Sequence, residues 1–198
     1  MTDFTGKIVL VTGAGKGTGH RVAEAFAAQG ATMAVNDISP VNLDDTVAHI
    51  LAAGGHVKAY VEDIAKKMPI QTLLNSVLDD FGRIDILVNC AEVEPQKTVL
   101  EMDDWDWQRT QDVNLNGPFL LTQSVGRIMK EKGGGIIVHV GERAKGTESR
   151  AAYFASKAGL AALSALSAYE LSEFGIRVYH FQPEENGDPA RQILELCG

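Results

Sequence analysis

The sequence has little of what marks several common classes of protein. Its 198 residues include two cysteines, Cys90 and Cys197, which do not have the spacing of metal ligands. No cluster of lysine and arginine stands out, and a formal charge of −8 opposes nucleic-acid and anionic-membrane partners, because phosphate binding needs a basic surface. No apolar run reaches transmembrane length, and the N-terminus lacks the charged-then-apolar pattern of a signal peptide. We therefore expect a cytoplasmic protein, in which Cys90 is a buried free thiol at the end of an apolar run.

The remaining composition is that of an ordinary globular protein. Hydrophobic residues make up 45% of the chain and charged residues 22%. This length allows one α/β domain with a sizeable core. No internal repeat, low-complexity segment or linker divides the chain, so we expect a single domain over residues 1–198.

Short apolar runs alternate with helical stretches along the chain. Near-continuous apolar strands between amphipathic helices indicate a parallel sheet that is covered on both faces. We therefore expect a doubly wound, Rossmann-type α/β fold with ligands at the carboxyl ends of the strands. The expected strands are residues 7–11, 31–35, 56–61, 84–88, 135–140 and 176–181, and the expected helices are 21–29, 43–53, 70–81, 104–132, with a weak point at Asn116-Gly117-Pro118, and 151–174.

A glycine-rich turn follows the first expected strand, in Thr12-Gly-Ala-Gly-Lys-Gly-Thr-Gly19. Glycines in this place let the backbone turn tightly, approach a pyrophosphate and pack the next helix on the sheet. The free N–H groups at the helix N-terminus would then face the anion. Gly13, Gly17 and Gly19 are therefore candidate dinucleotide-binding residues, and a plain connecting turn is the alternative.

Asp37 ends the second expected strand. A carboxylate there can accept hydrogen bonds from ribose hydroxyls and would repel a 2′-phosphate, which favours NAD over NADP. Lys16 favours the opposite choice, because a cation near the glycines helps to hold a phosphate. The alternative for Asp37 is a capping or turn residue, although Ser39 and Pro40 also suit the start of a helix.

Tyr153 and Lys157 are four residues apart at the start of an alanine-rich helical stretch. This spacing places both side chains on one face of a helix. A nearby ammonium favours the phenolate and moves the tyrosine pKa from about 10 toward neutrality, so the pair can transfer protons. The alternative is a packing aromatic residue beside a solvated charge.

Together these motifs resemble the short-chain dehydrogenase/reductase family over nearly the whole chain. In that family the tyrosine is the general acid/base, the lysine holds the nicotinamide ribose and lowers the tyrosine pKa, and a helix asparagine supports a proton-relay water. The resemblance implies an NAD-dependent oxidoreductase acting on a hydroxyl or carbonyl group of a small-molecule substrate. The matching positions are Thr12, Gly13, Gly17 and Gly19 in the turn, Asp63 near the adenine, Asn89 in Asn89-Cys90-Ala91-Glu92 (where two of four positions differ), Asn114, Tyr153 and Lys157.

The fifth strand departs from the family pattern. It is followed by Gly141-Glu142, where the family has a serine pair that polarises the substrate oxygen. A carboxylate beside Tyr153 would raise the tyrosine pKa and repel an oxyanion, opposing Lys157 by a similar amount. Thr147 and Ser149 either supply a substitute hydroxyl or are ordinary loop and capping residues.

The C-terminal part departs as well. The family has Pro-Gly and a threonine after the sixth strand, where this sequence has Pro183-Glu-Glu-Asn-Gly187. Residues 189–197 supply at most one short helix, so the resemblance implies that most of the usual substrate-covering segment is lacking. The joint departures leave a second hypothesis open: a cofactor-binding protein without hydride chemistry, used as a sensor or assembly partner.

The resemblance also implies self-association. In the family, helices corresponding to residues 104–132 and 151–174 pack across a two-fold axis. The second stretch carries Leu160, Leu163, Leu166 and Leu171, an apolar stripe that suits such an interface or, alternatively, the core.

Overall fold

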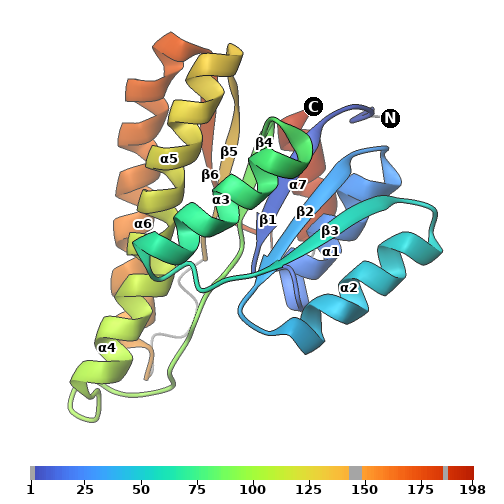
Figure 1. The fold of residues 1–198 in the computed structure, drawn as a ribbon. Helices are drawn as coiled ribbons and strands as arrows, with labels where there is room; N and C mark the ends of the chain where they lie inside the picture. The colour runs from blue at the N-terminus through green and yellow to red at the C-terminus, as the bar shows by residue number, and fades with distance from the viewer. Residues whose placement is uncertain (1–2, 143–148, 185–186) are drawn as a thin grey trace.

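The computed structural model describes residues 3–142, 149–184 and 187–198. Its centre is a six-stranded sheet in which all paired strands are parallel and the order is β3-β2-β1-β4-β5-β6 (Figure 1). This confirms the doubly wound α/β fold expected from the sequence. The strands are β1 (Ile8–Thr12), β2 (Thr32–Asp37), β3 (His56–Val61), β4 (Ile86–Asn89), β5 (Gly135–Val140) and β6 (Ile176–Phe181).

Helices cover both faces of the sheet (Figure 1). One face is covered by α1, α2 and α7, and the other by α3, α5 and α6. Among the described residues, no helix is both long and apolar enough to cross a membrane. The α-helices are α1 (Gly17–Ala28), α2 (Pro40–Ala52), α3 (Lys67–Phe81), α4 (Asp104–Gln111), α5 (Gly117–Lys132), α6 (Ala151–Leu171) and α7 (Pro189–Cys197), with a π-helical turn η1 (Asp112–Asn116) and a 3₁₀ turn η2 (Ser172–Phe174).

The apolar strands divide their side chains between two cores. Val9 and Val11 of β1 pack in the core beneath α1, whereas Leu10 packs in the core beneath α3 and α5. All five residues of β1 are buried. Burial on both faces explains why this strand is apolar throughout rather than alternating.

The helical stretch from α4 to α5 contains a π turn but no break. The helical stretch expected over residues 104–132 is continuous, and its irregular part, a π turn, ends at Asn116, where the expected weak point Asn116-Gly117-Pro118 begins. The chain passes from α4 through the π turn η1 directly into α5. Pro118 lies in the first turn of α5, where a missing N–H and a fixed φ are tolerated.

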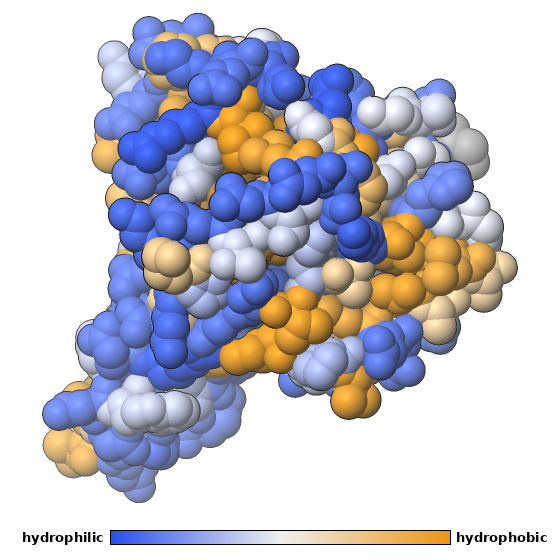
Figure 2. Space-filling view, viewed as in Figure 1, coloured by the Kyte–Doolittle hydropathy of each residue, from blue (hydrophilic) through white to orange (hydrophobic). Residues whose placement is uncertain are grey.

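The surface over β3 is unusual for an edge strand. Figure 2 shows a hydrophobic band that follows this strand, on which Val61 is exposed. Lys58 lies on the same strand and forms an ion pair with Asp80 of α3. Charges of this kind limit edge-to-edge pairing between copies of a sheet.

Candidate active site

A cleft of about 450 Å³ lies at the carboxyl ends of the strands. It opens where β1 and β4 are neighbours, which is the point at which the strand order reverses. Doubly wound folds bind ligands at this point, and the volume suits a small-molecule site. Its lining includes Gly13, Lys16, Gly17, Asp37, Asp63, Cys90, Glu92, Arg109, Glu142 and Pro183.

The glycine turn forms one wall of the cleft by close backbone packing. Gly13 has φ +64°, and a Cβ there would lie 2.5 Å from the Cα of Ala91, after β4. A Cβ on Gly19 would collide with the carbonyl oxygen of Gly13. Gly17 has φ +59° and open space around it. The turn thus requires glycine for two different reasons, steric contact and a left-handed backbone.

The N-terminus of α1 faces the same space without a cap. No side chain caps this terminus, and its first turn contains no acidic residue. Uncapped N–H groups and the helix dipole favour an anion. The turn and helix therefore fit the pyrophosphate of a dinucleotide.

Asp37 lies at the other side of the turn, in the lining of the cleft. One carboxylate oxygen accepts from Gly15 N at 3.1 Å, and the other accepts from Ser39 N at 2.9 Å. Ser39 is the N-cap of α2 and accepts from Asn42 N. Asp37 thus shapes two turns, and its negative charge still faces the position expected for a ribose. Its role in cofactor binding stays a prediction.

Asp63 lines the cleft and forms an ion pair with Arg109, a residue that the sequence did not identify. Arg109 of α4 donates to both of its carboxylate oxygens, at distances of 2.9–3.2 Å. Burial acts to raise the pKa of Asp63, but hydrogen bonds from Arg109 and Ala65 N hold that pKa below its usual value. The two residues are 46 positions apart, and no local motif signals the pair.

Asn89, the other predicted cofactor residue near β4, lies below the cleft. It is almost fully buried, and its amide nitrogen is 3.2 Å from Nδ1 of His139 on β5. His139 also approaches the Thr122 hydroxyl through Nε2, at 3.2 Å. Burial, with His180 and Lys157 nearby, lowers the pKa of His139 to about 3. A neutral imidazole therefore joins β4, β5 and α5 beneath the site.

Cys90 follows Asn89 and lines the cleft with a free thiol. The residue as a whole is partly exposed, but its sulfur is buried, in line with the expected buried free thiol. Burial of its sulfur raises the pKa of the thiol to about 12, an effect that Lys157 opposes. The thiol is therefore a weak nucleophile at neutral pH.

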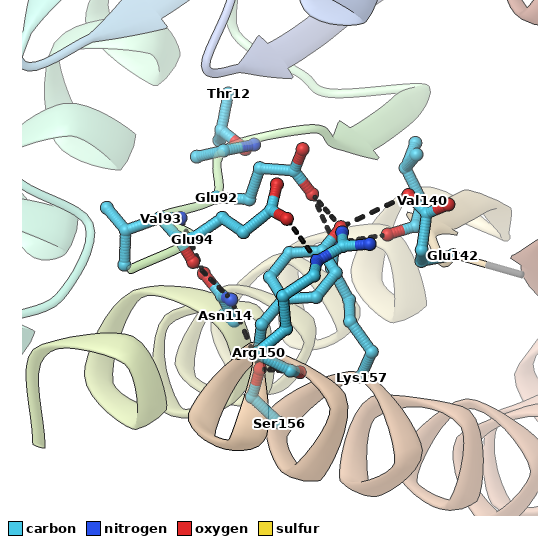
Figure 3. A network of polar contacts seen from close by, with 12 residues as sticks. Thr12, Glu92, Val93, Glu94, Asn114, Val140, Glu142, Arg150, Ser156 and Lys157 are labelled. Atoms are coloured by element: carbon cyan, nitrogen blue, oxygen red, sulfur yellow. Dashed lines mark hydrogen bonds and ion pairs between the residues drawn. The ribbon is translucent and has the colours of Figure 1, made fainter. Parts of the chain in front are cut away.

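The predicted pair, Tyr153 and Lys157, meets two carboxylates at the edge of the cleft (Figure 3). The Tyr153 hydroxyl lies 3.0 Å from Glu92 Oε2 and 3.3 Å from Glu142 Oε2. Lys157 Nζ lies 2.6 Å from Glu92 Oε2 and donates to the Val140 carbonyl oxygen at 3.0 Å. Both predicted residues are buried, whereas the Glu92 side chain is 42% exposed, so water partly screens these contacts.

These surroundings raise the pKa of Tyr153. The causes, in order, are burial, the charge of Glu92 and the charge of Glu142. The sequence predicts the effect of Glu142, and it leaves the outcome balanced against Lys157. The effects of Glu142 and Lys157 on the Tyr153 pKa do not cancel, because Glu92 adds a second carboxylate and itself forms an ion pair with Lys157. A single phenolic O–H donates to one carboxylate at a time, so the pair of acceptors favours a protonated tyrosine.

Glu92 is the main residue of the site that sequence reasoning missed. The signal was present, because Glu92 replaces the glycine of the family's Asn-Asn-Ala-Gly. Its position depends on contacts remote in sequence. Arg150 forms an ion pair with Glu94, and an isolated parallel bridge joins Lys97 to Arg150. These contacts hold the segment after β4 against the start of α6.

Asn114, which lies in the π turn η1, forms hydrogen bonds to the segment after β4. Its side-chain oxygen accepts from Val93 N, and its amide donates to the Val93 carbonyl, both at 2.9 Å. The amide also donates to the Ser156 hydroxyl at 3.1 Å (Figure 3). The side chain thus connects η1, the loop after β4 and α6, and the relay role stays a prediction.

Of the two candidate substitutes for the missing serine, the structure describes only Ser149, which does not line the cleft. Ser149 lines a separate hollow with Thr98 and Phe154. Thr147 lies outside the described residues, as do Glu185 and Asn186 of the segment after β6. Pro183 lines the cleft, and Glu184 is exposed.

Comparison with known proteins agrees with this geometry. Residues 7–186 match the short chain dehydrogenase family, so the chain belongs to that family. An uncharacterized oxidoreductase of Thermotoga maritima is 40% identical over 178 residues, which cover 89% of this chain and 70% of that relative. The family is that of oxidoreductases whose members use NAD or NADP.

Two solved structures are similar to this chain in fold as well as in sequence. A metagenomic short-chain oxidoreductase in complex with NADP has a TM-score of 0.94 and 28% identity, covering 99% of this chain and 92% of that one. An NAD⁺-bound xylitol dehydrogenase has a TM-score of 0.88 and 32% identity, covering 92% of this chain and 71% of that one. The described cleft lies where doubly wound folds hold such a dinucleotide.

Proposed function

We propose that this chain is an NAD-dependent oxidoreductase that interconverts a hydroxyl and a carbonyl group of a small molecule. The observation that carries this proposal is that Tyr153 and Lys157 contact Glu92, and Tyr153 also Glu142, two residues that line the cleft beside the glycine turn. NAD is favoured over NADP because Asp37 presents a carboxylate near the turn. The family membership and the dinucleotides named in the two structures support the cofactor class.

Each group of the cleft has a role in this proposal. Gly13, Gly17 and Gly19 allow the backbone to approach a pyrophosphate, and Asp37 accepts from ribose hydroxyls. A bound nicotinamide supplies the site for hydride gain or loss. Tyr153 holds or accepts the proton at the substrate oxygen through its hydroxyl. Asn114 fixes the loop that closes this end of the cleft, and with it the path for proton relay.

The Glu92 carboxylate sets the main condition for this chemistry. Lys157 acts on Tyr153 and on a ribose only when its ammonium is shared with, or released from, Glu92. Neutralising or withdrawing Glu92 would also remove the largest charge that raises the pKa of Tyr153. The acid/base residue would then respond to Lys157 as the sequence predicts.

A second candidate function rests on the same contacts. A protein that binds the dinucleotide without turnover, as a sensor or assembly partner, is favoured by the two carboxylates on the Tyr153 hydroxyl. In that case the tyrosine stays protonated and cannot accept a proton from an alcohol at neutral pH.

Two measurements separate these functions. Quenching or enhancement of NADH fluorescence tests binding, and steady-state rates with NAD⁺ or NADH over a panel of polyols, secondary alcohols and ketones test turnover. Turnover that is lost in Tyr153→Phe, with NADH binding retained, supports the oxidoreductase. Saturable NADH binding without turnover on any substrate supports the second function, and absence of binding contradicts both.

We also propose that the chain forms a homo-oligomer through α4, α5 and α6. Leu166 and Tyr169 of α6 are 57% and 82% exposed, and Phe119 of α5 is 45% exposed. Leu160 of the apolar stripe is instead buried in the protein, as the alternative of core packing required. Light scattering after gel filtration should give a multiple of 21.3 kDa, and Leu166→Arg should lower the observed mass.

A further inference from the structure

A second cluster of ligand-type side chains lies outside the cleft, where α1 packs beside α2. Glu24 Oε1 is 3.3 Å from His20 Nε2 and 3.0 Å from His49 Nδ1. The three atoms all lie within 4.8 Å of one another. His20 and Glu24 are one helical turn apart on α1, and His49 comes from the last turn of α2. None of these residues takes part in the proposed dinucleotide site.

The hydrogen bonds of Thr46 define which nitrogen of His20 carries a proton. The Thr46 hydroxyl donates to the Ala14 carbonyl at 2.8 Å, so its oxygen is left to accept from His20 Nδ1 at 2.7 Å. A hydroxyl has one hydrogen, and Nδ1 of His20 is therefore the donor. A neutral His20 then points the lone pair of Nε2 at the Glu24 carboxylate.

Two electron-rich atoms in such proximity require a positive group between them. The same carboxylate oxygen meets His49 Nδ1 as well, so it faces two ring nitrogens at once. His49 can donate an Nδ1–H to this oxygen, but the contact with His20 Nε2 requires either a second proton on His20 or a metal ion at the shared position. The arrangement around His20 matches the second case, since a histidine ligand commonly donates its other N–H to a fixed acceptor.

The distances agree with coordination. Metal-ligand bonds of about 2.0–2.2 Å in a tetrahedron separate ligand atoms by roughly 3.3–3.5 Å. The separations of 3.3 and 3.0 Å from Glu24 Oε1 are close to this spacing, and the two ring nitrogens lie within 4.8 Å of each other. The His49 side chain is 63% exposed and that of Glu24 38%, so the remaining coordination positions face water. Small changes of side-chain torsion on exposed groups would complete the site.

We propose that His20, Glu24 and His49 form a binding site for a divalent transition-metal ion of the Zn²⁺, Co²⁺ or Ni²⁺ class. Two imidazoles and one carboxylate suit these ions and disfavour Mg²⁺ and Ca²⁺, which prefer oxygen ligands alone. The ion would join α1 to α2. Through Thr46 and Ala14 it would also stiffen the glycine turn, because Ala14 lies between Gly13 and Gly15. This site does not depend on the proposed function.

The test is metal titration of the chelator-treated full-length protein by calorimetry with Zn²⁺, together with visible absorption of Co²⁺. We expect one equivalent of metal per chain and a Co²⁺ spectrum with nitrogen ligands. His49→Ala and Glu24→Gln should each weaken Zn²⁺ binding at least ~10-fold, since a three-ligand site loses one ligand. His56→Ala is the matched control, because His56 is an exposed histidine of β3 that is not a member of the cluster, and it should leave binding unchanged.

In this proposal Thr46 positions the His20 ring and does not touch the metal, so its role is tested by a separate pair of variants. Thr46→Val should weaken Zn²⁺ binding by about 10-fold or more, and Thr46→Ser should restore it. Amide hydrogen exchange in residues 13–19 should slow on addition of Zn²⁺ in the parent and not in His49→Ala. Equal Zn²⁺ affinity in the parent, His49→Ala and Glu24→Gln would overturn the proposal. Absence of saturable binding by the parent would do so too and would leave the cluster as an imidazolium-carboxylate pair.

Discussion

Lys157 and Glu92 form an ion pair in which Nζ and Oε2 are 2.6 Å apart. The same Glu92 oxygen receives the hydroxyl of Tyr153 at 3.0 Å. The Glu92 carboxylate therefore contacts both residues of the proposed proton-transfer pair, Tyr153 and Lys157. This geometry makes Glu92, and not the missing serine alone, the residue on which the proposed activity depends.

Glu92→Gly should release Lys157 and strengthen NADH binding by about 10-fold, because the ammonium regains a position for a ribose. Glu92→Gln keeps the size of the side chain without its charge and should give a smaller gain. NADH fluorescence titration measures both, and Glu131→Gln on the exposed end of α5 is the control. Identical dissociation constants in all four proteins would show that Glu92 does not compete for Lys157.

Acid should destabilise the protein through His139. Its pKa is lowered to about 3 in the folded state, against about 6.5 when unfolded, so the unfolded chain binds more protons between these values. The stabilisation is complete above pH 6.5 and is lost as the pH falls toward 3. Relative to His139→Gln, the free energy of unfolding of the parent should drop by ~1.4 kcal/mol per pH unit in this window. Urea unfolding at several pH values measures this slope, and parallel curves for the two proteins would refute it.

Gly19→Ala should lower the free energy of unfolding by about 2–3 kcal/mol, because the added methyl group meets the Gly13 carbonyl rather than a movable side chain. Gly126→Ala on α5 is the matched control. A Cβ there would lie 3.5 Å from Leu171 Cδ1, an ordinary contact, so alanine should stabilise by about 0.5–1 kcal/mol. Thermal or urea unfolding compares the two, and equal effects would contradict the steric explanation.

Asp37→Asn should shift the cofactor preference toward NADP. Removing the carboxylate charge removes repulsion of a 2′-phosphate, and we expect the ratio of the NADPH to the NADH dissociation constant to fall about 10-fold. The amide oxygen can still accept one of the two turn hydrogen bonds that Asp37 makes. Asp44→Asn, on the exposed face of α2, should leave the ratio unchanged. A fixed ratio in Asp37→Asn would place the discrimination elsewhere.

Hydrophobic patterning predicted the fold because each strand and helix carries its own signal. The six strands were all found, although β4 begins at Ile86 rather than at residue 84. Helices α1, α2 and α3 begin three or four residues earlier than predicted, at Gly17, Pro40 and Lys67. The first turn of α1 is Gly-Thr-Gly-His, and the first buried residues of α2 and α3 are Leu43 and Ile70, so the apolar periodicity begins after each helix has started.

The site was only partly predictable, since its chemistry depends on contacts between distant segments. Tyr153 and Lys157 could be identified from their spacing, and Glu142 from its place after β5. The effect of Glu92 required the loop after β4 to fold toward α6, which Asn114 and Arg150 enforce. Arg109 and His139 likewise acquire their partners, Asp63 and Asn89, only through the tertiary fold.

The π turn at Asp112–Asn116 determines the direction of the Asn114 side chain. A π turn holds one residue more than an α turn, and such turns within α-helices are often found at functional sites. Deleting that residue would restore regular α-helical hydrogen bonding, but it would rotate Asn114 away from Val93. The less regular turn therefore keeps Asn114 in contact with the loop after β4, and a one-residue change in length here would alter the site without changing Tyr153 or Lys157.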